Sequence, residues 1–168
     1  MPQVIGLTAA AQQVKSAVPR EAGEWNEEKF LEALRSNRNV DEANVVERIL
    51  RRAEEEGWAI WWGRGALQGS LFLGFRRDNF AKGDYWLVSF WTPGRVEVQF
   101  KTLRSRPPFD KEDLRRELMQ RFNQLPGVQL DAQNIGGLPS FQIAALTDDA
   151  AFAQLFEVLK WLQEQMTS

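Results

Sequence analysis

A strong hairpin signal in the middle of the chain constrains the fold more than any other stretch. Two runs rich in β-branched and aromatic residues, 86–91 and 96–103, flank a four-residue turn that contains Pro93 and Gly94. Such runs around a Pro-Gly turn are typical of an antiparallel hairpin. The first run is largely apolar on both of its alternating faces, whereas the second has one apolar and one polar face. We therefore expect this hairpin at the centre of a sheet.

The alternation along the first run makes a specific prediction about its side chains. Trp86, Val88 and Phe90 should share one face, and Ser89 and Trp91 should lie on the other. Along the second run Val96, Val98, Phe100 and Leu103 alternate with polar residues, although the step from Phe100 to Leu103 breaks strict alternation near the end.

Helical patterns lie on both sides of the strand region. Asn26 is a predicted cap for a first helix, and Asp41 is a predicted cap for a second helix that ends at Gly57. Asp110 is the predicted cap of a third helix, and residues 147–149 are expected to cap a final one. Strand patterns occupy residues 58–62, 66–75, 86–91 and 96–103, with weaker patterns at 128–130 and 141–145.

This order predicts an α+β domain with an N-terminal helical hairpin, a four-stranded antiparallel β-meander, then a helix, short strands and a C-terminal helix. Residues 1–23 are expected to be an N-terminal arm or linker, and residues 24–168 one domain with a sizeable core. The start lacks the pattern of a signal peptide, and no apolar run approaches the roughly 20 residues of a membrane span. We expect a soluble, cytoplasmic protein with no membrane contact.

The chain contains no histidine and no cysteine. Ser-His and Cys-His nucleophile pairs and zinc hydrolase sites therefore cannot be built from this chain alone. The net charge of −2 gives no overall basic field, so nucleic-acid binding would need a local patch of cations. Residues 95–121 hold such a local excess, with eight cations and five acids.

One row of polar residues carries a catalytic hypothesis. On a strand, Glu97, Gln99 and Lys101 would share one face, and with Asp84 upstream they resemble the carboxylates and lysine of metal-dependent restriction-type nucleases. The nuclease pattern has a carboxylate two residues before the lysine, where this chain has Gln99. A solvated sheet face with a cross-strand charge pair is therefore the favoured interpretation. No cofactor is expected, and Mg²⁺ would be needed only if Asp84, Glu97 and Lys101 form a nuclease site.

Seven tryptophans are many for this length, and a large aromatic core explains most of them. Periodicity places Trp58, Trp62, Trp86 and Trp161 in that core. Side chains on the alternate face would stack bases or fill a protein interface, together with cations near them in sequence. The candidate binding residues are Trp61, Arg64, Trp91, Arg95, Lys101, Arg104 and Arg106.

Four short stretches carry a family likeness: IWWGRG at 60–65, SFWTPGRVEVQF at 89–100, RPPFD at 106–110 and LPGV at 125–128. With these stretches, the chain resembles a group of bacterial modules of unknown function at the C-terminal end of larger proteins related to nucleases or DNA defence. The resemblance covers about residues 24–166 and implies an accessory module that contacts nucleic acid or a nuclease-type protein partner. We therefore expect a non-catalytic binding module, with a metal-dependent nuclease and a structural or oligomerisation domain as alternatives.

Overall fold

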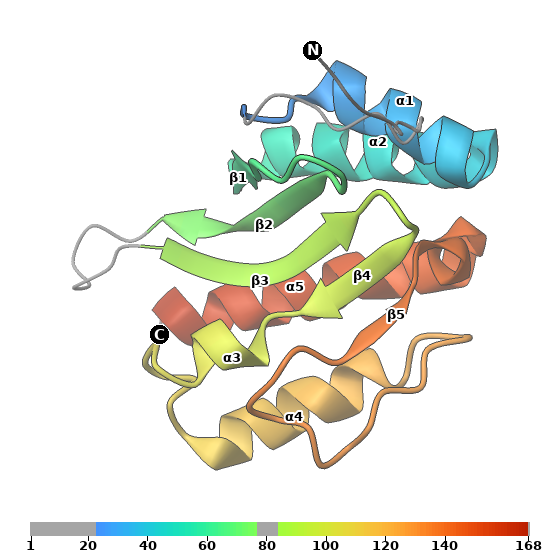
Figure 1. Ribbon diagram of the computed structural model, residues 1–168. Helices are drawn as coiled ribbons and strands as arrows, with labels where there is room; N and C mark the ends of the chain where they lie inside the picture. Colours follow the sequence, from blue (N-terminus) through green and yellow to red (C-terminus); the bar gives the residue numbers. More distant parts are fainter. Residues whose placement is uncertain (1–22, 77–83, 168) are drawn as a thin grey trace.

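The computed structural model describes residues 23–76 and 84–167 of the chain. It is an α+β fold with a five-stranded antiparallel sheet (Figure 1). Two helices precede the first four strands, two more lie between the fourth and fifth strands, and a long helix comes last. This confirms the predicted fold class. The predicted arm lies outside the described residues except for Gly23, and residues 77–83 lie outside them as well.

The N-terminal helical hairpin consists of α1 (Glu27–Asn37) and α2 (Val40–Glu56). The predicted cap of α1 is confirmed, because the Asn26 side chain accepts a hydrogen bond from the backbone N–H of Lys29 at 2.9 Å. Gly57 ends α2 with a φ of 75°, a left-handed conformation that favours glycine. Local capping signals therefore set both outer limits of the hairpin.

The predicted cap of α2 is wrong by two residues. Asn39, not Asp41, accepts the capping hydrogen bond, from the backbone N–H of Glu42 at 2.8 Å. The carboxylate of Glu42 is buried and pairs with Arg38 at 3.2 Å. A Cβ atom on Gly94 would lie 2.8 Å from Arg38 and 3.1 Å from Glu42, so the predicted hairpin turn packs directly on this ion pair.

The sheet has the strand order β1-β2-β3-β4-β5, with every neighbouring pair antiparallel. Its strands are β1 (Ala59–Trp62), β2 (Ser70–Arg76), β3 (Asp84–Trp91), β4 (Arg95–Val98) and β5 (Ser140–Gln142). The first four strands form the predicted meander. The fifth strand is shorter than predicted because a 3-10 helix, η1 (Ile143–Thr147), follows it, and residues 128–130 form no strand.

The second arm of the hairpin is also shorter than predicted. β4 ends at Val98, and Phe100–Leu103 form the short helix α3 instead of continuing the strand. Phe100 and Leu103 are both fully buried. Residues three apart point to opposite faces of a strand but to the same face of a helical turn, so only the helical turn buries both.

Two longer helices complete the domain, α4 (Glu112–Phe122) and α5 (Asp149–Thr167). Asp110 does not cap α4: successive turns over residues 106–111 delay the helix, and Lys111 occupies the cap position without a side-chain hydrogen bond. The cap of α5 is confirmed, because the Asp148 side chain accepts a hydrogen bond from the backbone N–H of Ala151 at 3.0 Å. In the described parts of the chain, no helix combines the length and apolar composition required to cross a membrane.

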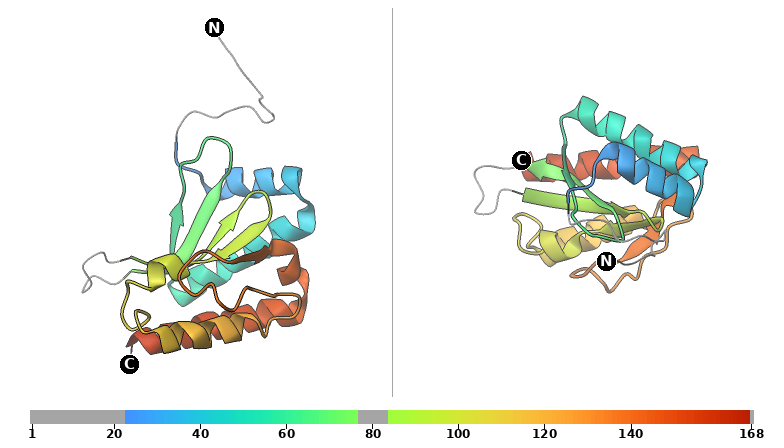
Figure 2. Two further views of the ribbon diagram at one scale, coloured as in Figure 1. Left: turned by 60° about the horizontal axis from the view of Figure 1, so that its bottom comes forward. Right: turned by 45° about the horizontal axis from the view of Figure 1, so that its top comes forward.

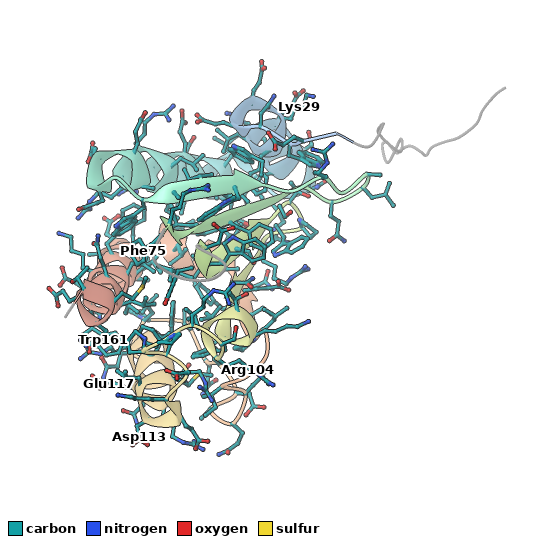
Figure 3. All side chains as sticks on the ribbon, turned by 90° about the vertical axis from the view of Figure 1, so that its left-hand side faces the viewer. Lys29, Phe75, Arg104, Asp113, Glu117 and Trp161 are labelled. Atoms are coloured by element: carbon teal, nitrogen blue, oxygen red, sulfur yellow. The ribbon has the colours of Figure 1, made fainter. Side chains whose placement is uncertain are left out.

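The long helices pack on one face of the sheet, which we call the helix-covered face. Phe75 lies on the α5 side of the sheet in Figure 3. The Trp58 ring stacks on Phe156 of α5 at 5.8 Å and meets Phe75 edge-on at 5.9 Å. Figure 2 shows α4 and α5 side by side, and α4 reaches the same face through the contact between Phe122 and Phe141. The hydrophobic core therefore fills the space between this face and the helices.

Candidate binding groove on the aromatic face

A β-bulge determines which side chains lie on the other face of the sheet. The register between β2 and β3 shifts at Gly74, which pairs with Trp86, so that Leu87 is an extra residue in β3. A Cβ atom on Gly74 would lie 1.8 Å from the backbone oxygen of Tyr85, so the bulge requires a glycine at this position. The extra residue reverses the alternation, and Trp86 lies on the same face as Trp91. The prediction that these two tryptophans point to opposite faces is therefore wrong.

Aromatic rings gather on this second face, which we call the aromatic face. Among the described residues, four of them form a continuous row that we call the aromatic stripe: Trp61, Phe72, Trp86 and Trp91. The Phe72 ring centroid lies 4.5 Å from that of Trp86 and 6.2 Å from that of Trp91. Trp86 in turn lies 6.3 Å from Trp61. All four rings are only partly buried, so the stripe retains exposed aromatic surface.

An arginine lies over each end of the aromatic stripe. The guanidinium carbon of Arg76 is 5.1 Å from the Trp61 ring centroid, and that of Arg95 is 4.9 Å from the Trp91 ring centroid. The electron-rich face of an indole attracts a cation at these distances. The middle of the stripe, Phe72 and Trp86, has no cation over it among the described residues.

Both of these arginines are also paired with a carboxylate. Arg95 Nε lies 3.1 Å from Glu97 Oε2, and Arg76 Nη1 lies 3.9 Å from Asp84 Oδ1. The side chain of Glu97 is 15% exposed, less than half the 33% exposure of Arg95. Each pair places one positive and one negative charge beside the rings, so the ends of the stripe are close to electrically neutral.

A buried serine connects the stripe to β4. Ser89 is fully buried, and its Oγ accepts hydrogen bonds from Gln99 Nε2 at 2.8 Å and from Trp91 Nε1 at 3.1 Å. The same hydroxyl lies 3.5 Å from Glu97 Oε1, to which it donates. These bonds fix the orientation of the Trp91 ring. Because Ser89 is inaccessible and the chain has no histidine to act as its base, the hydroxyl positions its neighbours instead of acting as a nucleophile.

A cavity of about 520 Å³ lies between the aromatic stripe and the segment that follows β4. Its lining consists of Phe72, Asp84, Trp86, Trp91, Glu97, Gln99, Lys101, Thr102, Ser105, Arg106 and Leu138. The volume falls within the range of roughly 300–1,000 Å³ that is typical of ligand sites. The early end of β4 creates this cavity, because the chain leaves the sheet plane at Gln99 and α3 forms a wall beside the first half of β3 (Figure 1).

The wall opposite the rings is polar, and we call its four lining residues, Lys101, Thr102, Ser105 and Arg106, the polar wall. Arg106 Nε donates to the backbone oxygen of Asp84 at 2.8 Å, and its Nη1 donates to Ser105 Oγ at 2.9 Å. The backbone N–H of Lys101 donates to the oxygen of Gly137 at 2.9 Å. Neither Lys101 nor Arg106 forms an ion pair with any other described residue. The wall therefore presents two cations that have no ion-pair partner among the residues that the structure describes.

The cavity brings together most of the residues that the sequence marks as candidates. Those that line it are Asp84, Trp91, Glu97, Lys101 and Arg106. Trp61 and Arg95 belong to the aromatic stripe and its end. Arg104 is exposed and lies against Gly136, and Arg64 is exposed in the turn between β1 and β2, so both stand outside the cavity.

The sequence interpretation missed Phe72 and Trp86. Gly74, inside a strand pattern, is a sequence signal for a possible bulge, but the face of Trp86 follows only from the register between β2 and β3. Gln99 is the residue that weakens the nuclease pattern, and in the structure its amide donates to Ser89, the hydroxyl that also holds Trp91. Gln99 is therefore assigned to the site because it lines the cavity, and not because of a sequence motif.

The cations of α4 serve different purposes from those of the polar wall. Arg115 donates to the backbone oxygens of Phe109, Asp110 and Ile135, which ties the start of α4 to neighbouring loops. Arg116 and Arg121 pair with glutamates one turn earlier on the same helix. Figure 3 shows Asp113 and Glu117 on α4, well apart from the sheet. The local excess of cations in residues 95–121 thus divides between the groove and a separate helix surface.

Within residues 23–76 and 84–167, no group of three or more His, Cys, Asp or Glu side chains is placed to hold a metal ion. The groove can instead stack a flat ring on its aromatic stripe and donate charge-assisted hydrogen bonds from its polar wall. No protein-family model, curated protein or solved structure matches the chain, so its function has to be inferred from this geometry.

Proposed function

We propose that this protein is a non-catalytic binding module that holds single-stranded nucleic acid in the groove on its aromatic face. The observation that carries the proposal is the aromatic stripe, whose neighbouring rings remain partly exposed beside a cavity with a cationic wall. Single-stranded nucleic acids bind proteins by stacking bases on such rings while lysine and arginine contact the phosphates.

The charges around the groove support this ligand. In the described part of the chain, four cations surround the stripe and cavity, Arg76, Arg95, Lys101 and Arg106, against two carboxylates, Asp84 and Glu97. The whole chain carries a net charge of −2, so the groove is positive relative to the average surface. A local surplus of this kind suits the phosphate backbone, because each phosphate contact releases condensed counterions.

A single strand fits this face better than a duplex. Base faces in a duplex are covered by their neighbours, whereas unpaired bases are free to stack on aromatic side chains. The rings here lie on the sheet, behind the polar wall, and not on a protruding helix that would enter a major groove. If these rings bound a protein instead, the chain would associate with itself or with another protein. The affinity of that association would lack the salt dependence of phosphate contacts.

The test is a fluorescence anisotropy titration with labelled single-stranded oligonucleotides at low and moderate salt. We expect affinity to fall as salt rises and Trp91→Ala to weaken binding by roughly tenfold, because one base stacked on an aromatic ring contributes about 1–3 kcal/mol. Trp91→Phe keeps a ring and should retain most of the affinity. Arg104→Gln, outside the cavity, is the matched surface control. Absence of binding at low salt, or binding that Trp91→Ala leaves unchanged, would contradict the proposal.

A second candidate function is a metal-dependent nuclease. It is favoured by one observation, namely that Asp84, Glu97 and Lys101 line the same cavity. Carboxylates would hold Mg²⁺ and the lysine would stabilise developing charge. Incubation with single-stranded and double-stranded DNA and Mg²⁺ or Mn²⁺ separates the two functions. Cleavage that is lost in Glu97→Gln would favour the nuclease, and cleavage that persists in Glu97→Gln would exclude this assignment.

A further inference from the structure

The proposed function leaves open which part of a strand occupies the polar wall. On the basis of that function, we propose that Lys101 and Arg106 bind a terminal phosphate monoester, so that the groove recognises the phosphorylated end of a single strand. Both side chains line the cavity, and neither forms an ion pair with a described residue. The arginines at the ends of the stripe differ in this respect, since each already has a carboxylate partner.

Arg106 is held ready to bind an anion. Its Nε and Nη1 donate to the backbone oxygen of Asp84 and to Ser105 Oγ, which fixes the plane of the guanidinium. Its Nη2 has no hydrogen-bond partner among the described residues. A guanidinium fixed in this way loses little conformational freedom when it binds a phosphate oxygen. Lys101, on the same wall, supplies a second, more mobile cation.

The segment that carries Arg106 is anchored at the start of β3. Arg106 bonds to the backbone oxygen of Asp84, and the Tyr85 hydroxyl donates to the backbone oxygen of Pro107. A strand that follows the rings of β3 from Trp91 to Trp86 therefore meets this segment at Asp84. Lys101 and Arg106 line the cavity beside this point, where they can hold a group at the end of such a strand.

The charge of the wall suits a monoester better than an internal phosphate. A phosphate monoester carries about −1.5 to −2 charges near pH 7 and has three terminal oxygens, because its second pKa is about 6. An internal diester carries a single negative charge, and a hydroxyl end carries none. Two cations without an ion-pair partner among the described residues therefore favour a phosphorylated end over a hydroxyl end.

The experiment compares three labelled oligonucleotides of one sequence, with a 5′-phosphate, a 3′-phosphate or two hydroxyl ends, by anisotropy titration against the full chain. We expect one phosphorylated form to bind about tenfold tighter than the hydroxyl form, as a charge-assisted hydrogen bond implies. Lys101→Gln should shrink that ratio below about threefold, and Arg106→Lys should also reduce it. Arg104→Gln, on the same segment but outside the cavity, should preserve the ratio.

The outcomes separate this inference from the proposed function. Equal affinity for all three oligonucleotides, or a preference that survives Lys101→Gln, overturns the terminal-phosphate site while binding of the hydroxyl form still supports the proposed function. Absence of binding to every form overturns both. Circular dichroism of each variant checks that the fold is retained. If Arg106→Lys unfolds, Lys101→Gln still tests the site, because the Lys101 side chain is exposed and its replacement should not disturb the fold.

Discussion

Strand β2 presents two phenylalanines to two different environments. Phe75, on the helix-covered face, is 7% exposed and meets Trp58 edge-on at 5.9 Å. Phe72, three residues earlier, lies on the aromatic face, remains partly exposed and contacts Trp86 and Trp91. The same residue type in the same strand thus belongs once to the core and once to the candidate site. The residue type alone does not distinguish these two roles. They differ because helices cover one face of the sheet and leave the rings on the other face partly exposed.

Arginines lie over different parts of the two aromatic clusters. On the helix-covered side, the guanidinium of Arg48 lies 4.1 Å from the Phe152 ring and that of Arg52 lies 4.7 Å from the Phe156 ring. These cations lie over two rings of α5 that are already buried in the core. On the aromatic face, the arginines lie over the two ends of the stripe and leave its middle open. The first cluster therefore contributes to the core, and the second retains exposed aromatic surface.

The largest expected effect comes from the two phenylalanines of β2. Phe75→Ala should lower the free energy of unfolding by about 3–5 kcal/mol, because it leaves a cavity between the sheet and α5. Phe72→Ala should cost only about 1–2 kcal/mol, because water already reaches its ring, but it should weaken oligonucleotide binding. Urea denaturation of both variants measures the difference. Equal losses of stability would show that the aromatic face is as closed as the core.

The next effect concerns the bulge that brings Trp86 onto the aromatic face. Gly74→Ala places a Cβ atom 1.8 Å from the backbone oxygen of Tyr85, so the two strands must separate or change register. We expect a loss of about 1–3 kcal/mol or more in unfolding free energy, together with weaker binding. Gly136→Ala is the matched control, because its nearest neighbour is the flexible end of Arg104 at 3.2 Å. A Gly74→Ala variant as stable as Gly136→Ala would contradict the bulge.

Local signals predicted the elements of this fold well. Asn26 and Gly57 carry capping chemistry within a few residues of the helix ends that they define, so their roles can be derived from sequence alone. The Pro-Gly turn likewise identified the central hairpin. Elements whose ends depend on burial were predicted less well. β4 ends at Val98 because Phe100 and Leu103 must both reach the core. The break in alternation between these two residues indicates an irregularity, but it does not give the residue at which the strand ends.

The candidate site was predicted only in part, for a similar reason. Lys101 and Arg106 were identified as cations near tryptophans, but their shared cavity depends on the chain leaving the sheet after β4. The sequence assigned Trp86 to the core because the alternation along β3 was taken as unbroken. In the structure Leu87 is an extra residue in β3, opposite Gly74 of β2, and it reverses the alternation. A bulge is a property of two paired strands. Its consequence for Trp86 therefore becomes predictable only once the pairing register is known.

The smallest expected effect compares two partly exposed ion pairs that each lie beside an aromatic ring. Arg95 pairs with Glu97 at 3.1 Å beside Trp91, and Arg52 pairs with Glu56 at 3.5 Å beside Phe156. Ion pairs near the surface contribute about 0.2–1 kcal/mol, so Arg95→Gln and Arg52→Gln should each lower the unfolding free energy by about 1 kcal/mol.

Their effects on binding should differ, because only Arg95 stands at the aromatic stripe. We expect Arg95→Gln to weaken oligonucleotide binding severalfold and to flatten its salt dependence, since it removes one cation that a phosphate can reach. Arg52→Gln should leave both properties unchanged, because Arg52 covers a ring on the helix-covered side. Anisotropy titrations over a salt series measure both slopes. If the two variants lose affinity equally, the cations act through the net charge of the protein, and the aromatic face has no privileged role in binding.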